Sequence, residues 1–305
     1  MLIGQVGEYE ASDIEAIVAR LLKDLGNPEP PLDLEMVRRQ LDVDLKYYSS
    51  NDVGLFDEVA HRLKMAGKQL FDKPTALFDA IRKAGLSALW VPSSRRIMID
   101  QEVPHPKHRW IEGHEIGHSL IPWHREFLFG DDGVTLDPAC HATVEAEANF
   151  ASARLLFLQE RFGAEARDCD LGFDTIKMMA KRYGNTLTST FWRIIEDREP
   201  DRPVFGMMTA HPRHPSIGRG DNGATVRYFI RSKAFRDQFA KFSAEDGYAV
   251  IEKYATARKR GPIFEETDII ANDRDEPCEF YFESFCNSYS LLTVGSFVSP
   301  RAIIV

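Results

Sequence analysis

The sequence predicts an α+β protein built from two domains. Apolar residues recur at helical spacing through most of the first 200 residues, with only short strand-like runs between them. Beyond residue 203 the pattern changes to runs typical of strands, with a single helical stretch among them. A length of 305 residues with 44% hydrophobic content is enough for two cores. We therefore expect a mainly helical domain with a small sheet at residues 1–202, followed by a smaller α+β domain at residues 203–305.

The elements of the first half follow from capping residues and breakers. Ser12 and Glu15 form a capping box, which predicts a helix that stops at the proline-rich run 27–31. The other elements expected before residue 105 are a short helix after Leu32, a strand at 42–48, a helical stretch at 55–86 with a break near Pro74, and two strands at 86–91 and 97–100.

A short motif on the next predicted helix carries the chemistry. Residues 110–120 have helical apolar spacing, and Pro122 ends the helix. His114 and His118 are four residues apart, so both imidazoles project from one face and can reach one Zn²⁺ at ~2.0–2.1 Å. Glu115 then lies beside the metal without binding it, where it can act as the general base.

A catalytic zinc site needs a third protein ligand and one open position. Thr143 can cap a helix that continues to Phe157, which places Glu145 in its first turn as the favoured ligand. Asn149 follows four residues later and is suited to orient a ligand by a hydrogen bond. Glu145 and Glu147 cannot both face the metal, and Glu147 is the weaker alternative because it lies only two residues before Asn149. We expect the glutamate that does not bind metal to be exposed to solvent.

Together the two motifs resemble the ImmA/IrrE metallo-endopeptidases, whose pattern is H-E-[IL]-G-H followed by E-x-x-A-N-x-F-A-x-x-L-L. The corresponding runs here are residues 114–120 and 145–156, and the likeness extends over about residues 30–200. The chain departs from the family at Phe157-Leu158, where the family commonly has Met-Pro; this affects the end of the helix and leaves the ligands intact.

The resemblance implies a zincin-like domain with one zinc ion per chain, held by His114, His118 and Glu145, with Glu115 as the catalytic base. It implies an endopeptidase that cleaves a specific protein, most often a helix-turn-helix transcriptional repressor, in a stress, DNA-damage or phage-related response. Some members carry a GAF-like sensor domain, which residues 203–305 resemble weakly. The competing class is a non-proteolytic regulator that binds a repressor or nucleic acid, although such a module has no need of Glu115.

Composition is consistent with a cytoplasmic protein. The N-terminus lacks the basic flank and apolar core of a signal peptide, and no apolar run approaches the ~20 residues that a membrane span requires. The four cysteines show no C-x-x-C spacing and predict free thiols in a reducing compartment; they are Cys140, Cys169, Cys278 and Cys286.

Residues 173–197 have the outline of a helix-turn-helix around Tyr183-Gly184-Asn185. The second helix offers only Arg193 as a long base-reading side chain early in its length, while Phe191 and Ile195 are residues that favour burial. We therefore predict that this helix packs against the peptidase core and does not read DNA.

The chain carries a net charge of −9, yet residues 201–262 hold twelve Lys and Arg against six Asp and Glu. This local excess indicates either a solvated face with internal ion pairs or a site for an anionic partner, such as an activating ligand or single-stranded nucleic acid. The candidate anion-binding residues are Arg227, Arg231, Lys233, Arg236, Arg258, Lys259 and Arg260.

Two further roles have candidates but no motif. The candidates for stabilising an oxyanion are Tyr183, Arg154 and His211. Cys140 precedes the helix of the third ligand, and its thiolate could cap the open zinc position and keep the enzyme latent. His124 or His141 could occupy the same position, and a buried free cysteine is the simpler interpretation of Cys140.

Overall fold

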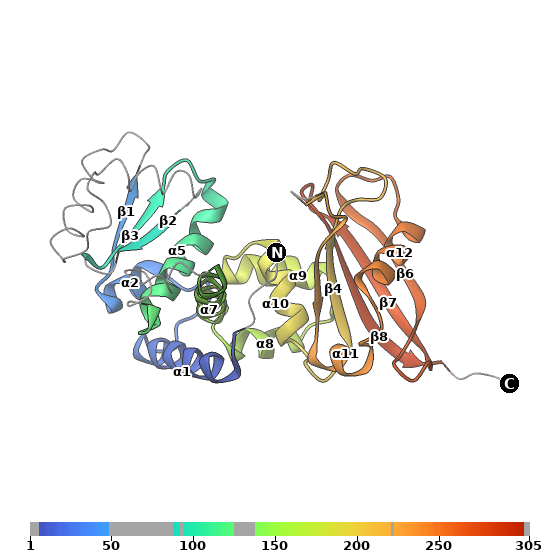
Figure 1. The fold of residues 1–305 in the computed structure, drawn as a ribbon, viewed down its shortest axis with the longest axis horizontal. Coiled ribbons are helices and arrows are strands. Elements are labelled where there is room, and N and C mark those ends of the chain that lie inside the picture. The colour runs from blue at the N-terminus through green and yellow to red at the C-terminus, as the bar shows by residue number, and fades with distance from the viewer. Residues whose placement is uncertain (1–5, 49–87, 92–93, 125–137, 221–222, 302–305) are drawn as a thin grey trace. The chain divides into compact units, whose positions relative to one another are not determined.

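The computed structural model confirms the α+β class, with helices and two sheets (Figure 1). It describes residues 6–48, 88–91, 94–124, 138–220 and 223–301. The helical stretch expected at 55–86 lies outside these residues. The chain divides into two compact units, one of Met1–Gln159 with Tyr183–Asn185 and the other of Glu160–Arg182 with Thr186–Val305.

The first unit contains a three-stranded sheet in the order β1-β3-β2. Its strands are β1 (Asp44–Tyr48), β2 (Ala88–Val91) and β3 (Arg96–Asp100), which agrees with the three strands predicted from the sequence. β3 pairs in parallel with β1 and antiparallel with β2. Ile97, Met98 and Ile99 of this central strand are all buried, as expected for a strand covered on both faces.

Among the described residues, the helices of this unit are α1 (Glu8–Asp24), α2 (Leu34–Leu41), α5 (His105–Leu120) and α7 (Pro138–Leu156). Three begin earlier than predicted. α1 starts after Gly7, four residues before Ser12, so the capping box does not mark its start. α5 starts after Pro104, and α7 starts at Pro138. Proline is tolerated at the start of a helix because the N–H that it lacks would have no hydrogen-bond partner in the first turn. Glu145 is therefore well inside α7 and not in its first turn.

Helices α5 and α7 approach each other closely along two glycines of α5. A Cβ on Gly117 would lie 2.6 Å from the carbonyl oxygen of Ala148, and one on Gly113 would lie 2.8 Å from Cδ1 of Leu156. Gly113 and Gly117 are four residues apart and so lie on the same face. This close backbone contact holds the histidines of α5 next to Glu145 of α7.

We expect Gly117→Ala to destabilise the protein by about 1–3 kcal/mol, since the new methyl group would meet a backbone oxygen that can move only with α7. Gly113→Ala should be milder, because its Cβ would meet the side chains of Ser152 and Leu156, which can shift. Chemical denaturation of both variants measures the difference. Equal losses would show that the close approach at Gly117 does not fix the two helices.

The second unit is built on a five-stranded antiparallel sheet in the order β5-β4-β8-β7-β6. The strands are β4 (Val204–Thr209), β5 (Val226–Arg231), β6 (Gly261–Ala271), β7 (Pro277–Cys286) and β8 (Leu291–Pro300). Four of them agree with the strand-like runs that the sequence shows at 204–210, 225–230, 279–285 and 291–298. β6 was missed because its middle, residues 265–268, reads Glu-Glu-Thr-Asp and lacks an apolar alternation.

Helices of the second unit lie on both faces of this sheet. They are α8 (Glu160–Arg167), α9 (Phe173–Tyr183), α10 (Leu187–Asp197), α11 (Lys233–Gln238) and α12 (Ala244–Tyr254). α10 lies on one face, and α11 and α12 lie on the other. Phe205 and Phe280 face a core that also contains Phe235 of α11 and Ile251 of α12. Gly206 lies against Phe191 of α10, and alternation along a strand places it on the opposite face.

These contacts bear on two expectations. The division between the compact units falls near residue 160, because α9 and α10 pack with the C-terminal sheet, whereas the sequence predicts a domain boundary after residue 202. Phe173 of α9 stacks on Phe285 of β7 at 5.3 Å between ring centroids, and Trp192 of α10 contacts Tyr228 of β5 at 5.2 Å. α10 is buried as predicted, and its main contacts are with α8 and with strands β4 and β5 of this sheet.

The burial of α10 also argues against DNA reading by this segment. Arg193, the one long basic side chain early in the helix, is 7% exposed and forms ion pairs with Glu196 and Asp197. A recognition helix presents its long polar side chains to the groove, which this arrangement does not allow.

None of the helices in the described part of the chain has the length and apolar character needed to cross a membrane.

Candidate metal centre

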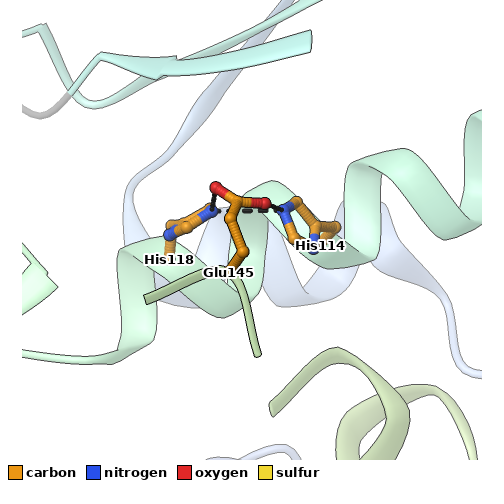
Figure 2. A group of neighbouring side chains, drawn as sticks. All are labelled: His114, His118 and Glu145. Atoms are coloured by element: carbon orange, nitrogen blue, oxygen red, sulfur yellow. Dashed lines mark hydrogen bonds and ion pairs between the residues drawn. The ribbon is translucent and has the colours of Figure 1, made fainter. Parts of the chain in front are cut away.

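Three side chains from two helices converge at one point (Figure 2). His114 and His118 come from successive turns of α5, and Glu145 comes from α7. The His114 Nε2 lies 3.1 Å from Glu145 Oε2 and 3.1 Å from His118 Nε2, and the His118 Nε2 lies 3.5 Å from Glu145 Oε1. The three residues could therefore hold one metal ion.

The distances are compatible with a tetrahedral metal ion such as zinc. On a tetrahedral zinc ion with bonds of ~2.0–2.1 Å, neighbouring ligand atoms lie about 3.3 Å apart. The observed separations of 3.1 to 3.5 Å fall on both sides of this value. Two imidazoles and one carboxylate also form a donor set used by catalytic zinc, with a fourth position left for water or substrate.

The orientation of His114 is fixed by Asn149, which we expected to orient a ligand. The amide oxygen of Asn149 lies 3.0 Å from Nδ1 of His114, so it can accept the Nδ1 proton and leave the Nε2 lone pair for a metal. Burial opposes ionisation at this site, but hydrogen bonds from His114 and His118 hold the pKa of Glu145 well below its usual range. Glu145 is therefore ionised at neutral pH, as a metal ligand would need to be.

Glu115 lies next to this triad on α5 but is held differently. Its side chain is buried beside strand β2, where the backbone N–H of Trp90 donates a hydrogen bond to the carboxylate. Burial raises the pKa of Glu115 to about 7; the negative charge of Glu145 acts in the same direction, while His114 opposes it. A carboxyl group with a pKa near neutrality is suited to accept and return a proton.

This raised pKa has a consequence for stability. The pKa of Glu115 in the folded protein lies above its unfolded value of 4.5, so its contribution is fully present below pH 4.5 and is lost as the pH rises through about 7. In metal-free protein we expect Glu115→Gln, which cannot ionise, to be more stable than wild type at pH 8 by roughly 3 kcal/mol. Urea denaturation with chelator at pH 4.5 and pH 8 measures the difference, and a difference that does not change with pH would contradict it.

Glu147 and His124 do not occupy the positions expected for them. Glu147 is 4% exposed and not solvated, because the indole N–H of Trp123 donates to its Oε2 at 2.7 Å and the His124 Nε2 lies 2.8 Å from the same oxygen. His124 does not cap the open position of the triad, because its Nδ1 lies 3.0 Å from Nδ1 of His118. That atom is on the other side of the His118 ring from Nε2.

One sequence signal could have drawn attention to His124. It follows His114 by ten residues, which is the spacing of the third histidine ligand in zinc peptidases with the pattern H-E-x-x-H-x-x-G-x-x-H. Ile121 stands where that pattern has glycine. A further residue that sequence reasoning missed is Tyr48 of β1, which is buried, and burial together with the charges of Asp100 and Glu115 raises its pKa to about 12.

The candidates for stabilising an oxyanion have other contacts. Arg154 pairs with Glu15 of α1 at 2.8 Å and is nine residues beyond Glu145, which is about 13 Å along α7. Tyr183 is fully buried and stacks on Phe157 beyond the end of α7. Neither is therefore placed beside the triad. His211 belongs to the second unit, where its Nε2 lies 2.9 Å from the carbonyl oxygen of Arg258.

The proposed zinc caps Cys140 and His141 belong to the first residues of α7, and their side chains lie outside the described part of the protein. The seven candidate anion-binding residues do not form one surface. Arg231 of β5 lies opposite Phe205, near the start of β4, in the register of the two strands. Lys233 and Arg236 follow it on α11. Arg227, Arg258, Lys259 and Arg260 are near the other end of the sheet, where β4 finishes and β6 begins.

An open pocket of about 410 Å³ adjoins this second group. Its lining combines the basic Arg258 with the acidic Glu265 and with apolar side chains including Ile263 and Phe264. The guanidinium of Arg258 donates to the carbonyl oxygen of Pro262 at 3.3 Å. The pocket is therefore mixed in charge, and its lining does not select for an anion.

Comparison with known proteins defines the fold only. No family model matches the chain, and no curated protein matches it. Among solved structures, the chain is similar to a Mycobacterium tuberculosis transcriptional regulator, with a TM-score of 0.54 and 10% sequence identity over 94% of this chain and 76% of that one. At this identity the likeness concerns the arrangement of helices and strands and not the chemistry of the site.

Proposed function

We propose that this protein is an intracellular zinc-dependent endopeptidase of the ImmA/IrrE kind, with a zincin-like first unit and a GAF-like, sensor-like C-terminal domain. The observation that carries the proposal is the convergence of His114, His118 and Glu145 at distances suited to tetrahedral zinc, with Glu115 buried next to them. A module that only binds a partner needs neither an open metal site nor a carboxylate with a pKa near 7.

The residues of the site divide the work of peptide hydrolysis. Zinc, when bound, supplies Lewis acidity that activates water and polarises the scissile carbonyl. Glu115 would act as the general base, which takes a proton from the attacking water and returns it to the leaving amine. Asn149 keeps the Nδ1 proton on His114, so that Nε2 faces the ligand position.

Strand β2 is suited to position a substrate beside this site. It is an end strand of the described sheet, it packs against α5, and the N–H of its Trp90 contacts Glu115. An extended peptide can add to the edge of such a strand through main-chain hydrogen bonds. We propose that the scissile segment lies along β2, which would bring its carbonyl next to Glu115.

The proposed substrate is a helix-turn-helix transcriptional repressor, and this part of the proposal comes from the likeness of residues 114–120 and 145–156 to the ImmA/IrrE motifs. One observation favours a second candidate function. The structural likeness to a transcriptional regulator fits a non-proteolytic protein that binds a repressor or nucleic acid. The two candidates differ in whether Glu115 is needed.

Digestion of repressor proteins tests the proposal. The zinc-loaded protein is incubated with small helix-turn-helix repressors encoded near its gene, and the products are identified by mass spectrometry. We expect one cleavage site in one repressor and little or no cleavage of casein, because a general protease would damage its own cell. Binding of a repressor without cleavage, at full zinc occupancy, would favour the regulator.

A further inference from the structure

A series of hydrogen bonds leads from Nδ1 of His118 to the buried carboxylate of Glu147. The Nδ1 of His118 lies 3.0 Å from Nδ1 of His124, and the Nε2 of His124 lies 2.8 Å from Oε2 of Glu147. His124 is fully buried and Glu147 is 4% exposed. The same oxygen of Glu147 accepts the indole N–H of Trp123 at 2.7 Å. The arrangement is built from α5, the residues after it, and α7.

When His118 binds a metal, only one arrangement of ring protons on His118 and His124 is compatible with these hydrogen bonds. The Nε2 of His118 then supplies its lone pair to the ion, so Nδ1 carries the proton and donates it to Nδ1 of His124. Because His124 accepts at Nδ1, it carries its own proton on Nε2 and donates that to the carboxylate of Glu147. Each ring nitrogen of His118 and His124 then has a partner, and the series of hydrogen bonds ends on Oε2 of Glu147.

The two histidine ligands are thus supported differently. His114 relies on Asn149, a neutral amide on an exposed residue. His118 relies on two buried residues that end in a negative charge. A carboxylate linked in this way to a ligating imidazole fixes the ring and raises its donor strength. Burial of a carboxylate away from water is unfavourable unless it accepts hydrogen bonds, and Trp123 and His124 both donate to Oε2 of Glu147.

We propose that His124 and Glu147 are positioning residues that act through His118 and set the metal affinity of the site. The inference rests on the proposed zinc site and concerns two residues that support a ligand without contacting the metal. Removal of such an outer partner typically weakens metal binding 10–100-fold. Glu147 is accordingly neither a metal ligand nor a surface residue.

Zinc affinity, measured by competition with a chelator, tests the proposal on the full-length protein. His124→Leu should weaken zinc binding by about 10–100-fold. His124→Gln should restore part of the loss, because the amide can both accept from His118 and donate to Glu147. Glu147→Gln, which keeps the shape and removes the charge, should weaken binding by a smaller factor. His108→Leu is the matched control. His108 is also on α5, but its Nε2 contacts the carbonyl oxygen of Val103 and takes no part in the hydrogen bonds from His118 to Glu147.

A second readout separates positioning from a loss of folding. In cobalt-loaded protein the visible absorption bands should change in His124→Leu and Glu147→Gln but not in His108→Leu, because only the first two alter the geometry at His118. Tight zinc binding in wild type together with unchanged affinity and spectrum in Glu147→Gln and both His124 variants would overturn this inference alone. Absence of stoichiometric zinc in the wild-type protein would instead overturn the zinc site and, with it, the inference. Should His124→Leu fail to fold, His124→Gln and Glu147→Gln still decide the matter.

Discussion

Replacing Glu145 with alanine is expected to leave the purified protein without zinc. The carboxylate is one of three protein atoms that converge within 3.1 to 3.5 Å of one another, and its loss leaves two imidazoles in a site built for three ligands. The reduction in affinity should exceed the ~10–100-fold effect of removing an outer partner, because a direct bond to the metal is lost. Elemental analysis after dialysis measures the zinc that remains.

Three comparisons make this result specific. His114→Ala should lose zinc in the same way, since it removes another ligand atom. Glu35→Ala is a suitable control because Glu35 is an exposed residue of α2. Glu147→Gln should still fill with zinc when the ion is in excess. Full zinc in Glu145→Ala, with loss in Glu147→Gln, would reverse the roles that we assign to the two glutamates.

The second large effect is expected at Glu115. Glu115→Gln should retain one zinc ion per chain but lose about 10²–10⁴-fold in the rate of repressor cleavage, because the amide cannot accept the proton of the attacking water. The substitution keeps the shape of the side chain and its hydrogen bond from Trp90. Single-turnover digestion, followed by gel or mass spectrometry, gives the rate.

The same variant separates the two candidate functions in cells. If relief of repression requires cleavage, Glu115→Gln should fail to relieve it although the protein accumulates normally. Equal relief by the wild type and by Glu115→Gln would favour a regulator that acts by binding. Zinc content must be measured in parallel, so that a loss of activity is not caused by a loss of metal.

The spacing of His114 and His118 could be interpreted from sequence because a helix places residues four apart on one face. Glu145 was proposed as the third ligand, but from a wrong start of α7: Pro138 opens the helix, and Thr143 does not cap it. Its place beside the histidines depends on the close contact at Gly117, which is a tertiary feature. Local patterns therefore indicated the ligand types, and helix packing determines their meeting point.

Other features depend on long-range contacts and could not be read from local patterns. His124 and Glu147 are 23 residues apart in sequence and meet only when α7 packs against α5. The division of the compact units near residue 160 could not be predicted locally, because α10 looks the same in sequence whichever sheet buries Phe191 and Ile195. β6 lacks apolar alternation in its middle, so its pairing with β7 defines it better than its own composition.

X-ray diffraction from crystals of the wild-type protein, recorded on both sides of the zinc absorption edge, tests the central claim most directly. The account predicts one anomalous peak per chain, bonded at ~2.0–2.1 Å to Nε2 of His114, Nε2 of His118 and an oxygen of Glu145. Glu115 should approach the ion without binding it. A peak bonded to His124 or Glu147, or no zinc in protein purified without chelator, would contradict the account.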